Sequence, residues 1–192
     1  RDRMRAWRFY DNLRTDADAP ARRAQVGTFT PVLASDGSDI GAAIQTIFEI
    51  GDSETLEQTI ADAFDGATLS VSDRFEIQMQ QHGLLRPLVA SELSDGTLRY
   101  VLLAAALLSP RPPELMILNE PEASLHPDLL DPLARLLMKA SQHCQIIVVS
   151  HSSRLVAELE KHPESHSIEL RKEMGETVVP RASEPEWKWP PR

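Results

Sequence analysis

The sequence predicts an α/β protein in which a mainly parallel sheet is flanked by helices, with a small β-hairpin region beside it. Two short apolar stretches, residues 115–118 and Gln145–Val149, have the pattern of buried strands and are separated by a helical segment. Apolar strands that alternate with helices are typical of parallel sheets covered on both faces. Hydrophobic residues make up 42% of the 192 residues, which is enough for a buried core and excludes disorder over most of the chain.

The N-terminal part of the chain predicts loops and then two amphipathic helices. Turn-forming residues at 16–20 and 35–38 indicate loops. A helix is expected after Asp39, whose side chain can cap the first turn, and a second helix follows Gly51. Their apolar residues recur at helical spacing: Ile40, Ile44, Ile47 and Phe48 in the first, and Leu56, Ile60 and Phe64 in the second.

Further along the chain, the period of the apolar residues changes to two. Phe75, Ile77 and Met79 alternate with polar residues and predict a strand, with residues 68–72 as its hairpin partner. A very apolar helix is expected to follow residues 93–97 and to stop at Pro110. The helix between the two buried strands is expected over residues 131–142, with Asp131 as its cap and Pro132 at its first position.

These elements suggest a division into three parts. Residues 1–92 form a lobe with the two amphipathic helices and the hairpin, and residues 93–180 form the part with the buried strands. Residues 181–192 form a flexible tail rich in Pro and Trp.

Charge and composition limit the classes of partner. The net charge is −9, and residues 36–70 carry eight acidic residues and no Lys or Arg, so this segment would repel DNA. Only the N-terminal arginines could contact DNA, and an ordinary solvated surface is the simpler interpretation of them: Arg1, Arg3, Arg5, Arg8, Arg14, Arg22 and Arg23. The longest apolar run, residues 100–108, is too short to span a bilayer. The single cysteine, Cys144, fits a cytoplasmic protein.

Polar residues follow both buried strands at the point where each strand ends. Asn119 and Glu120 follow the first, and Ser150 and His151 follow the second. Parallel sheets bind ligands beyond the carboxyl ends of their strands. There Glu120 could activate a water that attacks a phosphate, and His151 could bind the same phosphate. Ser94 and Gly96 stand where the apolar helix begins, and helix N-termini bind anions.

Four ordered motifs resemble those of ABC-type ATPase heads. Residues 93–97 (Leu-Ser-Asp-Gly-Thr) look like the signature loop, residues 115–120 like a Walker B strand, residues 123–127 (Ala-Ser-Leu-His-Pro) like a D-loop, and residues 149–152 like the switch histidine. The spacings of 26 residues from Ser94 to Glu120 and 31 from Glu120 to His151 suit such a head. The chain is most similar to bacterial AAA-family ATPases of the RecF, SMC and OLD type, and hence to the C-terminal portion of a P-loop NTPase head.

The resemblance implies ATP and Mg²⁺ as cofactors and a head-to-tail homodimer in which each signature loop closes over ATP held by the other subunit. It implies that Glu120 is the catalytic base and that His151 senses the γ-phosphate. Asn119 would lie at the metal. The remaining nucleotide-contacting or coupling residues implied by the motifs are Ser94, Asp95, Gly96, Thr97, Ser124 and His126.

Two departures from the family pattern affect this interpretation. No Gly-x-x-x-x-Gly-Lys-Ser/Thr motif occurs in the chain, which begins at Arg1 rather than Met. We therefore expect the C-terminal part of a longer ATPase, inactive by itself; the alternative is a head that has lost nucleotide binding. Asn119 stands where the Walker B pattern usually has Asp, and an amide is a weaker Mg²⁺ ligand than a carboxylate.

Other interpretations remain open. One is a nucleotide-gated interaction module with little hydrolysis, and another is the ATPase component of a DNA-repair or defence complex. The subunit of a membrane exporter is favoured least. Glu122 could be a second acid beside the nucleotide or an exposed loop residue, and His126 could contact a partner subunit or only pack in its loop.

Overall fold

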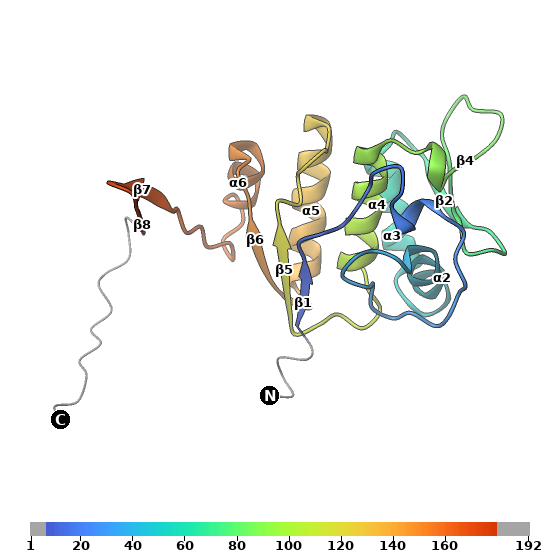
Figure 1. Cartoon of the computed structure of the whole chain (residues 1–192), viewed down its shortest axis with the longest axis horizontal. Coiled ribbons are helices and arrows are strands. Elements are labelled where there is room, and N and C mark those ends of the chain that lie inside the picture. Colours follow the sequence, from blue (N-terminus) through green and yellow to red (C-terminus); the bar gives the residue numbers. More distant parts are fainter. Residues whose placement is uncertain (1–6, 180–192) are drawn as a thin grey trace.

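The computed structural model describes residues 7–179 and contains a parallel sheet with helices packed against it (Figure 1). The sheet has the order β1-β5-β6, formed by Arg8–Tyr10, Leu115–Asn119 and Gln145–Val149. Both strand pairs are parallel, and the predicted α/β class is confirmed. Strand β1 was not expected, because three residues within a loop-rich segment carry too little pattern to predict a strand.

The helices of this part of the chain are α4 (Asp95–Leu107), α5 (Leu130–Ser141) and α6 (Ser153–Leu159). Helix α4 is buried on every side because it lies between the helices of the N-terminal lobe and α5 (Figure 1). The predicted cap at Asp131 is wrong: α5 starts earlier, after the short 3₁₀ helix Pro127–Leu129, and the Asp131 carboxylate pairs with Arg154 of α6.

The two amphipathic helices are α2 (Ile40–Ile50) and α3 (Ser53–Ala63), as predicted. Their apolar faces are buried in the common core. Asp39 precedes α2 but does not cap it, because its Oδ1 accepts a hydrogen bond from the backbone N of Ala34 instead. Asp52 caps α3 through the backbone N of Thr55.

A second sheet contains the predicted hairpin, β2 (Thr68–Val71) with β3 (Ile77–Gln80), in antiparallel register. Phe75 was expected in the strand but lies in the turn, with φ of 54°. A third strand, β4 (Leu88–Val89), pairs with β3 and leads into the 3₁₀ helix Ala90–Glu92 just before α4. This sheet thereby ends directly at the loop that carries Ser94.

Three remaining elements were not predicted. They are the 3₁₀ helix Pro20–Arg22 and the strands β7 (Arg171–Glu173) and β8 (Glu176–Val178), which form a hairpin set apart from the sheet in Figure 1. The division at residue 92 stays a prediction, and β1 crosses it by joining the sheet of β5. The predicted tail, 181–192, lies outside the described residues.

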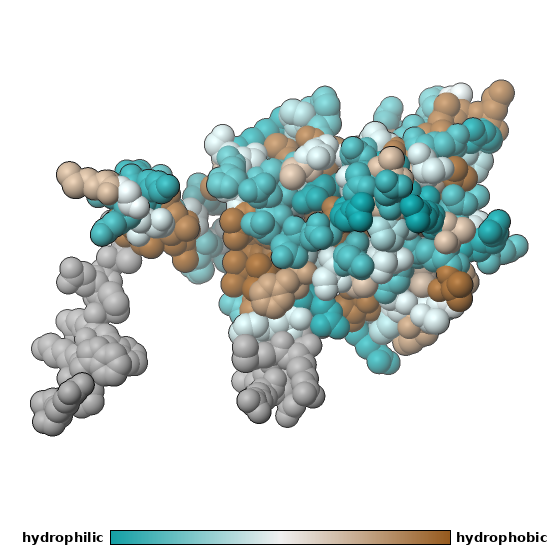
Figure 2. Space-filling view, in the orientation of Figure 1, coloured by the Kyte–Doolittle hydropathy of each residue, from teal (hydrophilic) through white to brown (hydrophobic). Residues whose placement is uncertain are grey.

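One face of the parallel sheet is open among residues 7–179. Parallel register places Phe9, Ile117 and Ile147 in one row on this face, and Figure 2 shows a hydrophobic area over β5 and β6. Phe9 is 48% exposed, Ile147 is 44% exposed and Val149 is 46% exposed. The prediction of a buried strand at Gln145–Val149 is therefore wrong for this side of β6, because the described helices cover only the opposite face.

Candidate functional site

The signature-like loop is held at the N-terminus of α4 by side chains from two segments. Ser94 is the N-cap residue: its Oγ accepts a hydrogen bond from the backbone N of Thr97 at 3.1 Å and lies 2.8 Å from Thr97 Oγ1. Arg22, almost fully buried, donates to the carbonyl of Leu93 at 2.7 Å and pairs with the Asp95 carboxylate at 2.7 Å. These contacts hold the N-terminus of α4 in place. The four predicted residues, 94–97, lie around it and are exposed or half-buried.

Gly96 has a packing role that sequence reasoning did not identify. A Cβ at this position would lie 2.6 Å from the carbonyl oxygen of Ser124, in the D-loop-like turn. Ser124 itself has a positive φ of 64°, which is uncommon for a residue with a side chain. The signature-like loop and the D-loop-like turn thus touch through their main chains, and a glycine is needed where they meet.

The carboxyl ends of β5 and β6 bring Glu120 and His151 together. The Nε2 of His151 lies 3.2 Å from Glu120 Oε1, although the residues are 31 apart in sequence. Glu120 has φ of 47°, and its backbone N donates to the carbonyl of Val149 at 2.8 Å. Both side chains are open to solvent, at 48% and 82% exposure. A water or phosphate could therefore reach a carboxylate and an imidazole at the same edge of the sheet.

His126 has a local structural partner. It caps the 3₁₀ helix Pro127–Leu129, because its Nδ1 accepts a hydrogen bond from the backbone N of Asp128 at 3.3 Å. The imidazole is otherwise exposed, as is the side chain of Ser124. Within residues 7–179, no hydrogen bond or ion pair joins Ser94 or Thr97 to Glu120 or His151. The predicted residues therefore form two clusters, one of residues 94–97 at the N-terminus of α4 and one of Glu120 and His151 at the ends of β5 and β6.

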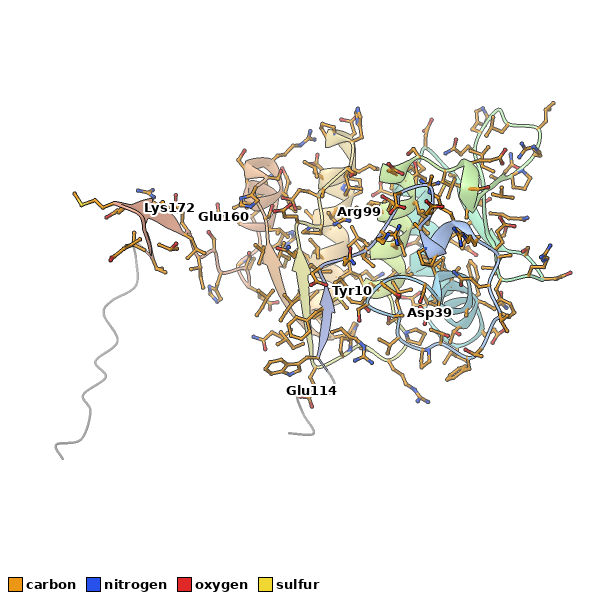
Figure 3. The ribbon with its side chains drawn as sticks, in the orientation of Figure 1. Tyr10, Asp39, Arg99, Glu114, Glu160 and Lys172 are labelled. Carbon is orange, nitrogen blue, oxygen red and sulfur yellow. The ribbon has the colours of Figure 1, made fainter. Side chains whose placement is uncertain are left out.

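Arg99 connects the two clusters and was not predicted. It lies on α4, one turn after the signature-like loop, and is labelled in Figure 3. Its Nη2 donates to the carbonyl of Glu120 at 2.9 Å, and its Nη1 donates to the carbonyl of Leu13 at 3.0 Å. A single basic residue within an otherwise apolar helix was the available sequence signal.

The sequence left the role of Glu122 open between a second acid beside the nucleotide and an exposed loop residue. In the structure its side chain is partly buried and hydrogen-bonded. Its Oε1 accepts hydrogen bonds from the hydroxyl of Ser150 and from the backbone N of His151 and Ser152. The carboxylate therefore organises the turn that carries the predicted switch histidine.

Among the N-terminal arginines that the structure describes, Arg14, Arg22 and Arg23 are engaged within the chain. Arg22 is buried, Arg14 makes two hydrogen bonds to Asp16, and Arg23 pairs with Asp18. These intramolecular pairs weaken the case for a DNA-binding surface at this end of the chain. Arg1, Arg3 and Arg5 lie outside the described residues.

Residues 7–179 contain no cluster of three or more His, Cys, Asp and Glu side chains that could hold a metal ion. Asn119 offers a neutral amide beside the Glu120 carboxylate, and these two groups alone do not make up a Mg²⁺ site. In the same part of the chain, no helix combines the length and hydrophobicity needed to cross a membrane.

Comparison with known proteins places the chain in a protein family. The profile of the family described as "AAA domain, putative AbiEii toxin, Type IV TA system" matches residues 1–157. A probable metal transport system ATP-binding protein of Chlamydia pneumoniae is 39% identical over 61 residues, which cover 32% of this chain and 24% of that protein. The matched stretch is thus about a quarter of that relative's length.

Solved structures of SMC proteins share the fold. A structure determined for the ATP-driven dimerization and DNA stimulated activation of SMC ATPases has a TM-score of 0.55 at 20% identity, with 73% of this chain and 87% of that chain covered. An Smc head bound to the C-winged helix domain of ScpA has a TM-score of 0.56 at 18% identity, with 77% and 54% covered. An Smc head of Pyrococcus yayanosii has a TM-score of 0.54 at 19% identity, with 76% and 29% covered.

Proposed function

Because this chain belongs to the family described as "AAA domain, putative AbiEii toxin, Type IV TA system", whose profile matches residues 1–157, we propose that it forms part of an ATP-hydrolysing site of the ABC, SMC and RecF type. The observation that carries this proposal is the 3.2 Å contact between His151 and Glu120 at the carboxyl edge of the parallel sheet. Glu120 accepts the proton of a water that attacks the γ-phosphate, and His151 donates a hydrogen bond to that phosphate.

The N-terminus of α4 supplies the second half of the proposed site. Backbone N–H groups in the first turn of a helix have no acceptor within the helix, and they favour an anion together with the helix dipole. The residues around this end are Ser94, Asp95, Gly96 and Thr97, and they bind the γ-phosphate of a nucleotide held by another head. In the head-to-tail pair that we propose, the nucleotide is contacted by the Ser94 loop of one head and by Glu120 of the other.

The phosphate cradle of the P-loop comes from a segment other than residues 1–192, which have no Gly-x-x-x-x-Gly-Lys-Ser/Thr motif. Two features of the sheet support this part of the proposal. Among residues 7–179, strand β6 lies at the edge of the sheet and the face with Phe9, Ile117 and Ile147 is open, whereas parallel sheets are normally covered on both faces. A P-loop-bearing segment that pairs with β6 and covers this face would place its phosphate site beside His151.

The test is ATP turnover and ATP binding by the protein that carries both this chain and a P-loop. Glu120→Gln is expected to lower kcat by about 10²–10⁴-fold while nucleotide binding is retained, because only the base is lost. Glu164→Gln, an exposed acid in a loop after α6, is the matched control and should leave turnover unchanged. Equal kcat values for Glu120→Gln and wild type would refute the assignment of the base.

Asn119 favours one alternative function, a nucleotide-gated interaction module with little hydrolysis. Its neutral amide weakens the ligand set for a hard cation at the end of β5. Retained ATP-dependent dimerisation with negligible turnover would support this alternative. A several-fold rise in turnover of Asn119→Asp would identify the amide as the cause.

A further inference from the structure

Three hydrogen bonds from the turn between β6 and α6 end on a single carboxylate oxygen, and the turn adds one of its own from Ser152 N to Ser150 Oγ at 3.0 Å. Glu122 Oε1 accepts from the Ser150 hydroxyl, from His151 N at 3.0 Å and from Ser152 N at 3.1 Å. Ser152 Oγ in turn caps α6 by accepting from Leu155 N at 3.3 Å. The path of the main chain through His151 is therefore determined by Glu122, which follows β5, as well as by β6, the strand that His151 follows.

Glu120 is held at both of its main-chain polar groups. Its N donates to the Val149 carbonyl, and its carbonyl accepts from Arg99 Nη2 at 2.9 Å. The positive φ of Glu120, 47°, costs energy for a residue with a side chain, and such a conformation persists only when surrounding contacts determine it. Arg99 and the end of β6 provide these contacts.

Arg99 and Glu122 lie close enough to act electrostatically on each other. Burial lowers the pKa of Arg99, and the carboxylates of Glu122 and Glu120 oppose that shift. The guanidinium donates to the carbonyls of Leu13 and Glu120, whereas the side chains of Glu120 and His151 are open to solvent. Charged groups that are half-buried in this way interact more strongly than groups on an open surface.

We propose that Glu122 is a positioning residue for the hydrolytic site. It holds the turn so that the imidazole of His151 faces Glu120, while Arg99 fixes the main chain of Glu120 from α4. This inference rests on the proposed function, because it assigns a role for turnover to a residue outside the reacting atoms. It also gives α4 a direct link to the base: movement of the helix that carries the signature-like loop acts on the Glu120 carbonyl through Arg99.

Amide hydrogen exchange tests the geometry without requiring any enzyme activity. In Glu122→Ala, the His151 amide is expected to exchange at least about tenfold faster than in wild type, because it loses its acceptor, whereas the Ser152 amide should change less because it also donates to Ser150 Oγ at 3.0 Å. Glu122→Gln retains an oxygen of the same reach and should restore much of the protection. Unchanged exchange in Glu122→Ala would overturn the proposal.

Steady-state kinetics of the protein with its P-loop tests the role. Glu122→Ala is expected to lower kcat by about 10²-fold with little change in the KM for ATP, since misplacement of the reacting groups affects turnover more than binding. Partial rescue of kcat by Glu122→Gln is expected, and Glu164→Gln is again the control. Faster exchange with an unchanged kcat would overturn the positioning role.

Two further outcomes, an unfolded Glu122→Ala variant and an inactive wild type, also test the proposal. If Glu122→Ala does not fold, Ser150→Ala removes one donor to Glu122 and one acceptor of the Ser152 amide, and it leaves the contacts of His151 N and Ser152 N with Glu122. A moderate fall in kcat is then expected, and no change in either exchange or kcat would refute the proposal. If wild type itself has no ATPase activity, the proposed function fails, and the exchange measurement still decides whether Glu122 holds the turn.

Discussion

Replacement of Gly96 by alanine separates two reasons for a glycine at the start of α4. Its position at a helix N-terminus predicts close approach of the backbone to a phosphate, which affects only the nucleotide-bound state. The structure adds a reason that applies without nucleotide, because the new Cβ would lie 2.6 Å from the Ser124 carbonyl oxygen. The two reasons predict different results for the protein in the absence of ATP.

The magnitude follows from two opposing contributions. Alanine is favoured over glycine in a helix interior by about 1 kcal/mol, and by less in the first turn. To restore an ordinary contact with the main chain of Ser124, either segment must move by about 0.8 Å, and overpacking of this kind costs about 1–3 kcal/mol. The expected net loss is about 1 kcal/mol, which corresponds to a fall in Tm of about 2–4 °C for a chain of this size.

Thermal and urea unfolding without nucleotide measure this loss. Gly41→Ala in α2 provides the reference for a larger clash, because its Cβ would lie 1.8 Å from the carbonyl oxygen of Phe75. The Tm should decrease in the order wild type, Gly96→Ala, Gly41→Ala. A Tm of Gly96→Ala equal to or above wild type, together with weakened nucleotide binding, would show that the packing argument is wrong.

Three further substitutions or measurements test the structure. Tyr100→Phe should raise the free energy of unfolding by about 1 kcal/mol, because the buried Tyr100 hydroxyl has no hydrogen-bond partner among the described residues; a lower Tm would contradict this. Hydrogen bonds from Arg86 lower the pKa of Glu92 to about 2, so this carboxylate contributes stability above its ordinary pKa, which is lost as the pH falls toward 2. Urea midpoints of wild type and Glu92→Gln should therefore differ near neutral pH and converge in acid, whereas a constant difference would argue against the pair. Burial raises the pKa of the Cys144 thiol, so labelling by a disulfide reagent should be at least about 10²-fold slower in native than in unfolded protein, and equal rates would place the thiol at the surface.

Sequence pattern was sufficient where neighbouring residues alone determine the structure. The 3.6-residue period of Ile40, Ile44 and Ile47 predicted α2, and the period of two predicted the hairpin of β2 and β3. The apolar stretch at 115–118 predicted β5, and the position of Glu120 after it predicted a polar residue at a strand end. These patterns reflect local backbone geometry, which repeats within a few residues.

Contacts with residues outside the helices themselves decided several features that the sequence did not predict. Asp39 precedes α2, but its carboxylate accepts a hydrogen bond from Ala34 N and does not cap the helix. Asp131 lies in the first turn of α5, and its carboxylate pairs with Arg154. The exposure of Ile147 depends on what lies over one face of the sheet, which is not encoded in the five residues of β6.

The candidate site divides in the same way. From sequence alone, Glu120 and His151 could be assigned to strand ends, and the parallel sheet then predicted that these ends lie at one edge. Only the tertiary structure decided that Glu122 holds the turn of His151, that Arg99 reaches the Glu120 carbonyl, and that Gly96 packs against Ser124. Each of these contacts joins residues 21 to 30 positions apart, where a hydrogen bond depends on the packing of whole elements and leaves no periodic signal in the sequence.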